Sequence, residues 1–163
     1  MDSGAAALGR SAAAELEREM GLKIELKPGE RLMLGDCVIT NHDQRTRLLV
    51  EGAAPILREK DIMTESRADT PAKRIYLAVQ LMYTSKDPAE YHDLYFRLVR
   101  DIVQAAPSMW PLIESINNQI LTGEMYKALK ETKKLIAYEG KLLENARSTQ
   151  GLRGRGQGNS QPA

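Results

Sequence analysis

The residue types that most often carry catalysis or bind metals are sparse in this sequence. Its 163 residues include one cysteine, Cys37, and two histidines, His42 and His92. These three residues do not have the spacing of metal ligands, and no glycine-rich loop with the phosphate-binding pattern precedes a helical segment. The acidic residues are scattered among lysines and arginines. We therefore expect no catalytic residue, no metal site and no cofactor, and a protein that works by binding a partner.

A catalytic pair of cysteine and histidine would require the fold to bring Cys37 to one of the two histidines. We instead interpret Cys37 as a buried, small apolar residue on a strand. A single cysteine excludes an internal disulfide and fits a reducing compartment. The sequence shows neither an apolar run of about 20 residues nor a signal-peptide pattern. These features predict a cytoplasmic protein that does not enter the membrane.

Arginines and lysines remain as side chains that could bind a charged partner. The net charge is only +1, so any contact with nucleic acid depends on local placement of basic residues. Arg45 and Arg47 lie two apart on a predicted strand and therefore share a face, and Arg31, Arg58 and Lys60 lie on neighbouring strands. One interpretation is a solvated face or an edge protected against aggregation. The other is a cationic surface for phosphates or single-stranded bases; the pattern alone favours the first.

Basic residues also gather toward the C-terminus, where residues 123–163 carry eight basic and four acidic side chains. The last predicted helix contains Lys127, Lys130, Lys133 and Lys134. These lysines either solvate the helix or extend a cationic surface toward RNA. Arg153 and Arg155, in a glycine-rich segment, would add weak and salt-sensitive contacts to nucleic acid.

The first half of the chain has the pattern of short strands. Leu22, Ile24 and Leu26 alternate with charged residues, which indicates a half-buried strand. Further apolar runs separated by turn residues predict strands over 31–34, 37–40 and 45–51. Residues 56–62 form a fifth strand or an extended arm. Four or five short strands with tight turns describe a small antiparallel sheet.

The pattern becomes helical after residue 62. Thr70-Pro71 is a helix start, with a capping oxygen followed by proline at the first helical position. Asp87-Pro88 opens a second helix that ends before Pro107, and two more helices are expected over 110–121 and 124–147. The aromatic residues at helical spacing are Tyr76, Tyr83, Tyr91, Tyr95 and Phe96. We expect them to be core residues rather than the lining of a partner groove.

These patterns predict an α+β protein with four parts. Residues 1–20 form a flexible extension, residues 21–62 a β module, residues 63–147 a helical region and residues 148–163 a disordered tail. About 40 residues rarely hold a fold without help. The β module should therefore pack on the helices, dimerise through strand pairing, or both.

Three strings, in this order, resemble the FlbT family of flagellar regulators. They are Leu26-Lys27-Pro28-Gly29-Glu30-Arg31, then Leu57-Arg58-Glu59-Lys60-Asp61-Ile62, then Asp69-Thr70-Pro71-Ala72-Lys73-Arg74-Ile75-Tyr76, followed by Gln80-Leu81-Met82-Tyr83. The resemblance covers roughly residues 21–145. It implies post-transcriptional control of flagellin, through association with the 5′ untranslated region of flagellin mRNA and promotion of its decay.

The β module also resembles CsrA, a small mRNA-binding dimer of five strands. The similarity rests on Gly29-Glu30, Gly35-Asp36, Ala54-Pro55 and Arg58-Glu59. In that family the first strand and an arginine at the last strand contact RNA, which implies roles for residues 22–27 and for Arg58. The segment before Ile62 is shorter here, and a shift of one position would turn Arg58 to the opposite face of its strand.

Because of these resemblances, we favour the interpretation of the basic residues as a cationic binding surface over their interpretation as a solvated face. The RNA-binding candidates are Lys27, Arg31, Arg45, Arg47, Arg58 and Lys60. The first hypothesis is an mRNA-binding repressor of flagellum biogenesis, with the flagellin mRNA 5′ leader as its partner and no need for a catalytic residue. The second is a flagellar chaperone or adaptor whose helices bind another flagellar regulatory protein. Under either hypothesis the protein could form a homodimer.

Overall fold

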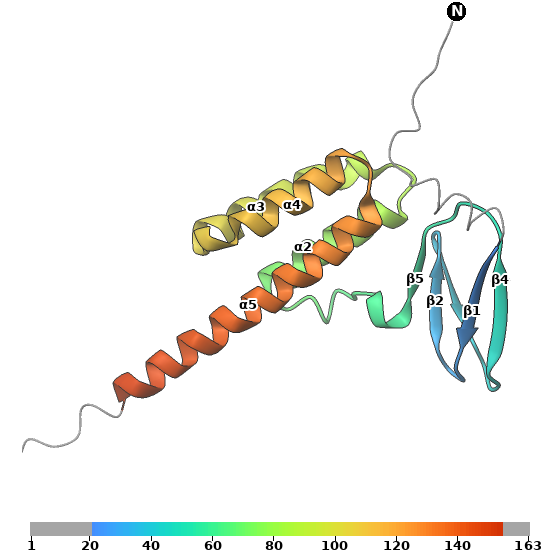
Figure 1. The fold of residues 1–163 in the computed structure, drawn as a ribbon, viewed down its shortest axis with the longest axis horizontal. Coiled ribbons are helices and arrows are strands. Elements are labelled where there is room, and N and C mark those ends of the chain that lie inside the picture. Colours follow the sequence, from blue (N-terminus) through green and yellow to red (C-terminus); the bar gives the residue numbers. More distant parts are fainter. Residues whose placement is uncertain (1–20, 155–163) are drawn as a thin grey trace, which may run out of the picture.

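Five short strands precede four α-helices in the part of the chain that the structure describes, residues 21–154 of a computed structural model (Figure 1). The strands are β1 (Leu22–Leu26), β2 (Arg31–Leu34), β3 (Cys37–Thr40), β4 (Thr46–Val50) and β5 (Ile56–Arg58). The α-helices are α2 (Pro71–Thr84), α3 (His92–Ala105), α4 (Trp110–Leu121) and α5 (Met125–Gly154). Short 3-10 helices are η1 (Glu59–Asp61), η2 (Pro88–Tyr91) and η3 (Pro107–Met109). The α+β prediction is confirmed.

The strands form two sheets where the sequence suggested one. All pairs are antiparallel: β1 pairs with β4, and β2 lies between β3 and β5. Ile24 and Leu26 of β1 pack against Leu32 of β2 in a small core between the sheets. The split has a physical reason, because the apolar face of each sheet needs a cover and the other sheet supplies it.

The helices enclose a second and larger core. α2 packs against α3 and α5, and α4 packs against α5. Thr70 caps α2 by accepting a hydrogen bond from the Lys73 backbone N–H, with Pro71 at the first helical position as expected. The fully buried large residues of this core include Ile75, Val79, Met82, Tyr95, Ile113, Ile116, Leu129 and Leu135.

One face of α2 holds the segment that connects the strands to the helices. Tyr76 Oη donates to the Asp61 carbonyl (2.6 Å). One turn later, Gln80 Oε1 accepts from Met63 N (2.7 Å) and Gln80 Nε2 donates to Met63 O (3.0 Å). A further turn along, Tyr83 Oη bonds both the N–H and the carbonyl of Ile56. Because residues four and seven apart share a helix face, α2 binds the backbone of residues 56–63 over three successive turns.

Two further contacts join the β module to the helices. Leu57 of β5 is buried in the helical core. The buried carboxylate of Asp61 forms an ion pair with Lys133 of α5. The β module therefore packs on the helices, as its small size led us to expect.

The C-terminal helix is longer than the sequence suggested. We expected it to end at Arg147, but α5 continues to Gly154, so the first residues of the predicted tail are helical. Glu139, buried in the middle of α5, accepts a hydrogen bond from the Ala72 backbone N–H at the start of α2 (2.9 Å). The predicted extension, residues 1–20, and the end of the predicted tail, residues 155–163, lie outside the described residues.

Two predictions about burial are wrong. Cys37 lies on a strand as expected but is exposed, because β3 is an edge strand and Cys37 sits beside the tight turn at Gly35-Asp36. Among the helical aromatics, Tyr76 and Tyr95 are buried, whereas Phe96 is 53% exposed. Phe96 follows Tyr95 directly on α3, so the two side chains point about 100° apart around the helix and only one can face the core.

Candidate nucleic-acid interface

The six basic residues predicted to bind RNA come from five neighbouring pieces of backbone and are all exposed. They are Lys27 after β1, Arg31 at the start of β2, Arg45 before β4, Arg47 within β4, Arg58 at the end of β5, and Lys60 in η1. They do not share a single face. Arg47 lies on the outer side of the β1–β4 sheet, opposite Glu25. Arg31 lies on the side of β2 that also carries Met33, which packs toward the helices.

Three of the arginines converge on Glu25 of β1. Arg45 Nη1 lies 2.6 Å from Glu25 Oε1. Arg47 is the cross-strand neighbour of Glu25, and Arg58 Nη2 donates to the Glu25 backbone carbonyl (2.8 Å). We expected Arg45 and Arg47 to share a face of one strand; β4 begins at Thr46, so Arg45 precedes the strand, but both arginines lie beside Glu25.

The electrostatics of Glu25 follow from these neighbours. The hydrogen bond and the charge of Arg45 hold the pKa of the Glu25 carboxyl below its ordinary value, and the charges of Arg47 and Arg58 lower it further. A depressed folded-state pKa stabilises the fold above the unfolded-state pKa. This contribution is lost as the pH falls through the folded-state pKa.

Replacing Arg45 with glutamine should raise the pKa of Glu25 toward its ordinary value, since the strongest hydrogen bond and the nearest charge are both removed. An NMR titration of the Glu25 side-chain carboxyl carbon measures this directly. Arg97→Gln, on an exposed position of α3, should leave the titration unchanged. An unchanged Glu25 titration in the Arg45 variant would show that this ion pair does not persist in solution.

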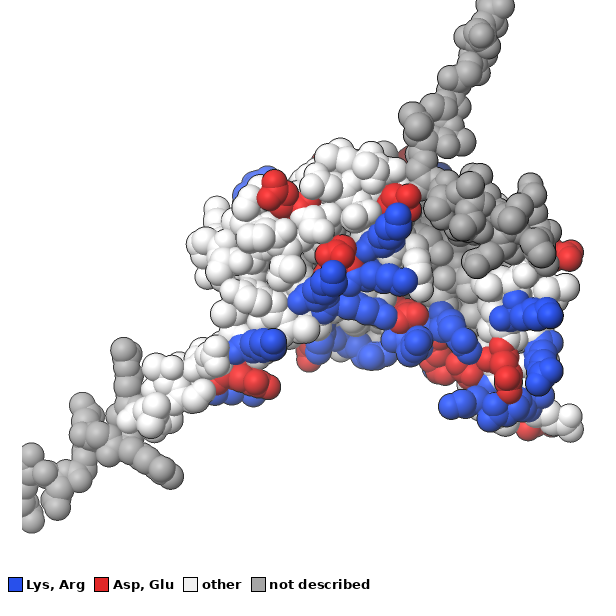
Figure 2. All heavy atoms as spheres, viewed as in Figure 1, with Lys and Arg blue, Asp and Glu red and all other residues white. Residues whose placement is uncertain are grey.

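Carboxylates are interleaved among the other cations as well. Arg31 Nε lies 3.8 Å from Glu59 Oε1, and Arg58 Nη2 lies 3.8 Å from Glu30 Oε1. Figure 2 shows this part of the molecule as red carboxylates set among blue basic side chains. Over residues 21–62, seven basic side chains are balanced by seven acidic ones, so the formal net charge of the β module is zero. The surface is thus mixed in charge, rather than purely cationic as we expected.

Asn41 fixes the end of the β module where Lys27 and Arg45 lie. Its side-chain amide donates to the carbonyls of Leu26, Lys27 and Gln44, at 3.1, 2.9 and 2.7 Å. The backbone carbonyl of Asn41 accepts from the Gly29 backbone N–H (2.8 Å). Gly29 has a positive φ of 75°, a conformation that suits glycine in a tight turn. One asparagine therefore joins the β1–β2 turn to the β3–β4 connection and holds both basic residues at one end of the module.

The lysines of α5 have specific partners of their own. Lys127 pairs with Glu124 (3.4 Å), Lys134 with Glu131 (2.8 Å) and Lys133 with Asp61. Lys130 Nζ lies 4.8 Å from the centre of the Tyr126 ring, in a cation–π contact. In Figure 2, blue side chains continue from the β module across the middle of the molecule, where α5 runs in Figure 1.

Sequence reasoning missed an open cleft of about 1440 Å³ between the β module and the helices. Its walls come from the start of β1, the β2–β3 turn, the β4–β5 connection, the end of α2 and the start of α5. Lys23, Lys60 and Lys86 line it together with Tyr83 and Tyr126. No local pattern marks these residues as a group, because the fold assembles them from positions up to about 100 residues apart.

None of the helices within residues 21–154 is long and apolar enough to cross a membrane. In the same stretch, no group of three or more histidine, cysteine, aspartate and glutamate residues is placed to hold a metal ion.

Comparison with known proteins places this fold in a family. A family model described as "Flagellar protein FlbT" matches residues 22–143, which is most of the chain. The chain belongs to the FlbT family. Among FlbT relatives, "Probable flagellum biosynthesis repressor protein FlbT 1" of Bradyrhizobium diazoefficiens is 64% identical over 124 residues, which cover 76% of this chain and 85% of the relative.

Other FlbT proteins match over the same region. A "Probable flagellum biosynthesis repressor protein FlbT" of Rhodopseudomonas palustris is 52% identical over 76% of this chain and 98% of its own length. The "Flagellum biosynthesis repressor protein FlbT" of Caulobacter vibrioides is 38% identical over 79% and 94%. No solved structure matches this chain. The resemblance of the β module to CsrA therefore stays a prediction.

Proposed function

We propose that this FlbT-family protein represses flagellum biosynthesis by binding the 5′ untranslated region of flagellin mRNA and promoting degradation of the message. Relatives that are up to 64% identical over the aligned region are named as flagellum biosynthesis repressors, which supports the regulatory role. The observation that carries RNA binding is the placement of six exposed basic residues on neighbouring short strands and tight turns.

The ion pairs on this surface do not prevent it from binding RNA. Exposed pairs between arginine and glutamate contribute only about 0–1 kcal/mol. A phosphate group can therefore replace Glu25 or Glu30 as the partner of a guanidinium at little cost, and it accepts two parallel hydrogen bonds as a carboxylate does. Occupation of the leader would block ribosomes or expose the transcript to nucleases, so repression requires no catalytic residue.

A titration of the full-length protein with flagellin leader RNA tests the proposal. Affinity for the leader should exceed affinity for a scrambled RNA of equal length and composition. Arg45→Ala and Arg58→Ala should each weaken binding by about 1 kcal/mol, roughly fivefold. Arg97→Ala, on an exposed position of α3, is the matched control. Equal binding of leader and scrambled RNA would refute specific recognition.

A second function, as a chaperone or adaptor, is favoured by apolar side chains exposed on the helices. Phe96 of α3 and Trp110 and Leu121 of α4 are 53%, 47% and 81% exposed. Aromatic side chains such as Phe96 and Trp110 are enriched in surfaces that bind another protein, which here would be a flagellar regulatory protein or a second copy of the chain. Capture of a flagellar protein that resists ribonuclease, without any enriched transcript, would favour this function over RNA binding.

A further inference from the structure

We infer that an unpaired stretch of the leader RNA enters the cleft between the β module and the helices, where lysines contact its phosphates and Tyr126 stacks on a base. This inference rests on the proposed function and assigns it a second surface. Of the six residues discussed above, Arg58 and Lys60 line the cleft as well, and the other four flank the path of the RNA.

The first feature of the cleft that favours RNA is the charge of its side chains. Lys23, Lys60 and Lys86 line the cleft, and none of their three side chains forms a hydrogen bond or ion pair with another described residue. By contrast, Arg31, Arg45 and Arg58 are each paired with a glutamate. The cleft thus presents cations that need not give up a partner before they bind a phosphate.

Two of the three acidic residues of the cleft are already paired with lysines. Among the described residues three acids line it, Asp36, Asp61 and Glu124. Asp61 is paired with Lys133 and Glu124 with Lys127, while Asp36 accepts only a weak bond from the Cys37 thiol (3.6 Å). A polyanion in the cleft therefore meets a surface whose negative charge is largely neutralised.

The aromatic component is Tyr126, at the start of α5. Its ring contacts the Tyr83 ring, with 6.1 Å between the ring centres, and Lys130 lies over it. Tyr83 is itself fixed by its bonds to the Ile56 backbone. Tyr126 is nevertheless 44% exposed. A ring that is held in place yet open to solvent can stack on a base with little loss of side-chain entropy.

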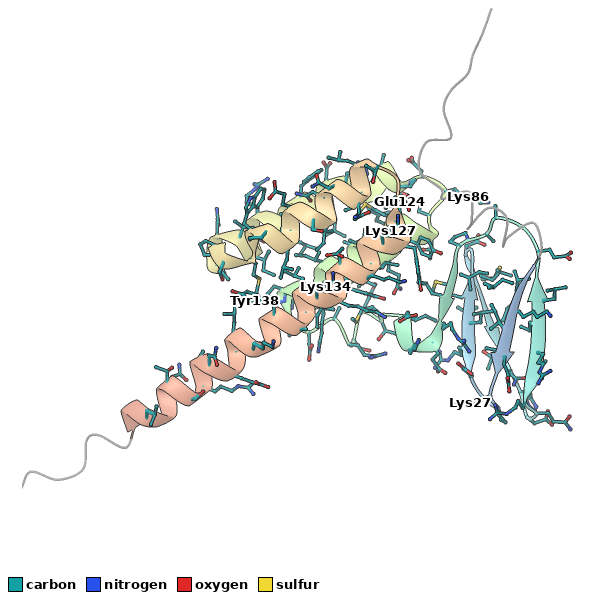
Figure 3. All side chains as sticks on the ribbon, viewed as in Figure 1. Lys27, Lys86, Glu124, Lys127, Lys134 and Tyr138 are labelled. Atoms are coloured by element: carbon teal, nitrogen blue, oxygen red, sulfur yellow. The ribbon has the colours of Figure 1, made fainter. Side chains whose placement is uncertain are left out.

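The combination identifies the ligand as a single strand. Proteins bind unpaired nucleic acid through a basic groove in which aromatic side chains stack on successive bases. The cleft is also larger than the roughly 300–1,000 Å³ typical of small-molecule pockets, which suits a stretch of chain better than one metabolite. Lys86 and Lys127 both line the cleft, whereas Lys27 does not and lies at the far end of the β module in Figure 3. Substitutions can therefore separate the two regions.

The test is a titration of the full-length protein with flagellin leader RNA over a range of salt concentrations. Tyr126→Leu should weaken binding by about tenfold through the lost stacking contact. Lys86→Gln should lower the slope of log affinity against log salt by about 0.7, the value for one phosphate contact on a single strand. Tyr138→Leu and Lys141→Gln, further along α5 and outside the cleft, should leave affinity and slope unchanged.

The outcomes distinguish the two proposals. If the wild-type protein does not prefer the leader to scrambled RNA, the proposed function fails and the cleft assignment fails with it. If the wild type binds and Arg45→Ala weakens binding while Tyr126→Leu and Lys86→Gln do not, only the cleft assignment is overturned. Ultraviolet crosslinking gives an independent readout, since the RNA should attach to the peptide containing Tyr126. If Tyr126→Leu instead abolishes capture of a protein after ribonuclease treatment, the cleft binds a protein and not RNA.

Discussion

Replacing Leu32 with alanine should lower the stability of the β module by about 2–5 kcal/mol, the range for a large residue truncated in a core. Leu32 is fully buried between the two sheets, where Ile24 and Leu26 are the only other buried members of this core among residues 21–154. So small a core cannot rearrange to fill the cavity, and a module of this size has little stability to lose. Hydrogen exchange of strand and helix amides measures the effect separately in the two parts.

Leu49→Ala is the matched control for this experiment. Leu49 is a leucine in the same module but is 57% exposed on β4, so its truncation should change stability by no more than about 0.5 kcal/mol. Strand amides should exchange much faster in the Leu32 variant, while amides of α2 and α5 change less. Equal effects of the two substitutions would mean that the sheets do not form a core in solution.

Gln80→Ala should lower the free energy of unfolding by on the order of 3 kcal/mol. The loss should come from weaker attachment of residues 56–63, the linker between the strands and the helices, and not from a weaker α2. Gln80 is buried and pairs with both the N–H and the carbonyl of Met63. Its removal leaves two backbone groups without partners, at about 1–3 kcal/mol for each that stays buried. Urea denaturation followed by circular dichroism gives the change in the free energy of unfolding.

Two companion variants show whether hydrogen bonds or packing produce the loss. Gln80→Leu keeps the volume of the side chain but neither hydrogen bond, so it should be nearly as destabilising as alanine. Gln104→Ala, on an exposed position of α3, should have little effect. If Gln80→Leu proves as stable as the wild type, the paired amide is not what holds the linker on α2.

The fold could be predicted wherever its signals are local. Alternation in residues 22–26 and the Gly35-Asp36 turn identified strands, and Thr70-Pro71 identified the start of α2. The split into two sheets was not predictable in this way, because strand pairing depends on residues distant in sequence. The exposure of Cys37 was missed for the same reason: burial on a strand depends on whether the strand lies at an edge, and no local pattern reveals that.

The candidate site could be predicted only in part. Its basic residues were identified, but their glutamate partners were not. One signal was present, since Glu25 occupies an outward position of β1 between Ile24 and Leu26, on the side where Arg47 also faces outward. The cleft had no such signal. Lys23, Lys86 and Tyr126 come from three distant parts of the chain and meet only through the packing of β5 and η1 on the helices.

The contacts that α2 makes with residues 56–63 have a consequence for how this family can diverge. Tyr76, Gln80 and Tyr83 bond to peptide groups of that segment and not to its side chains. Every residue type other than proline carries the same peptide N–H and carbonyl. Exposed positions such as Glu59 and Lys60 can therefore mutate without weakening the hydrogen bonds between α2 and this segment. We expect orthologues to keep the three α2 residues while exchanging charges along the linker, so that ligand preference evolves independently of architecture.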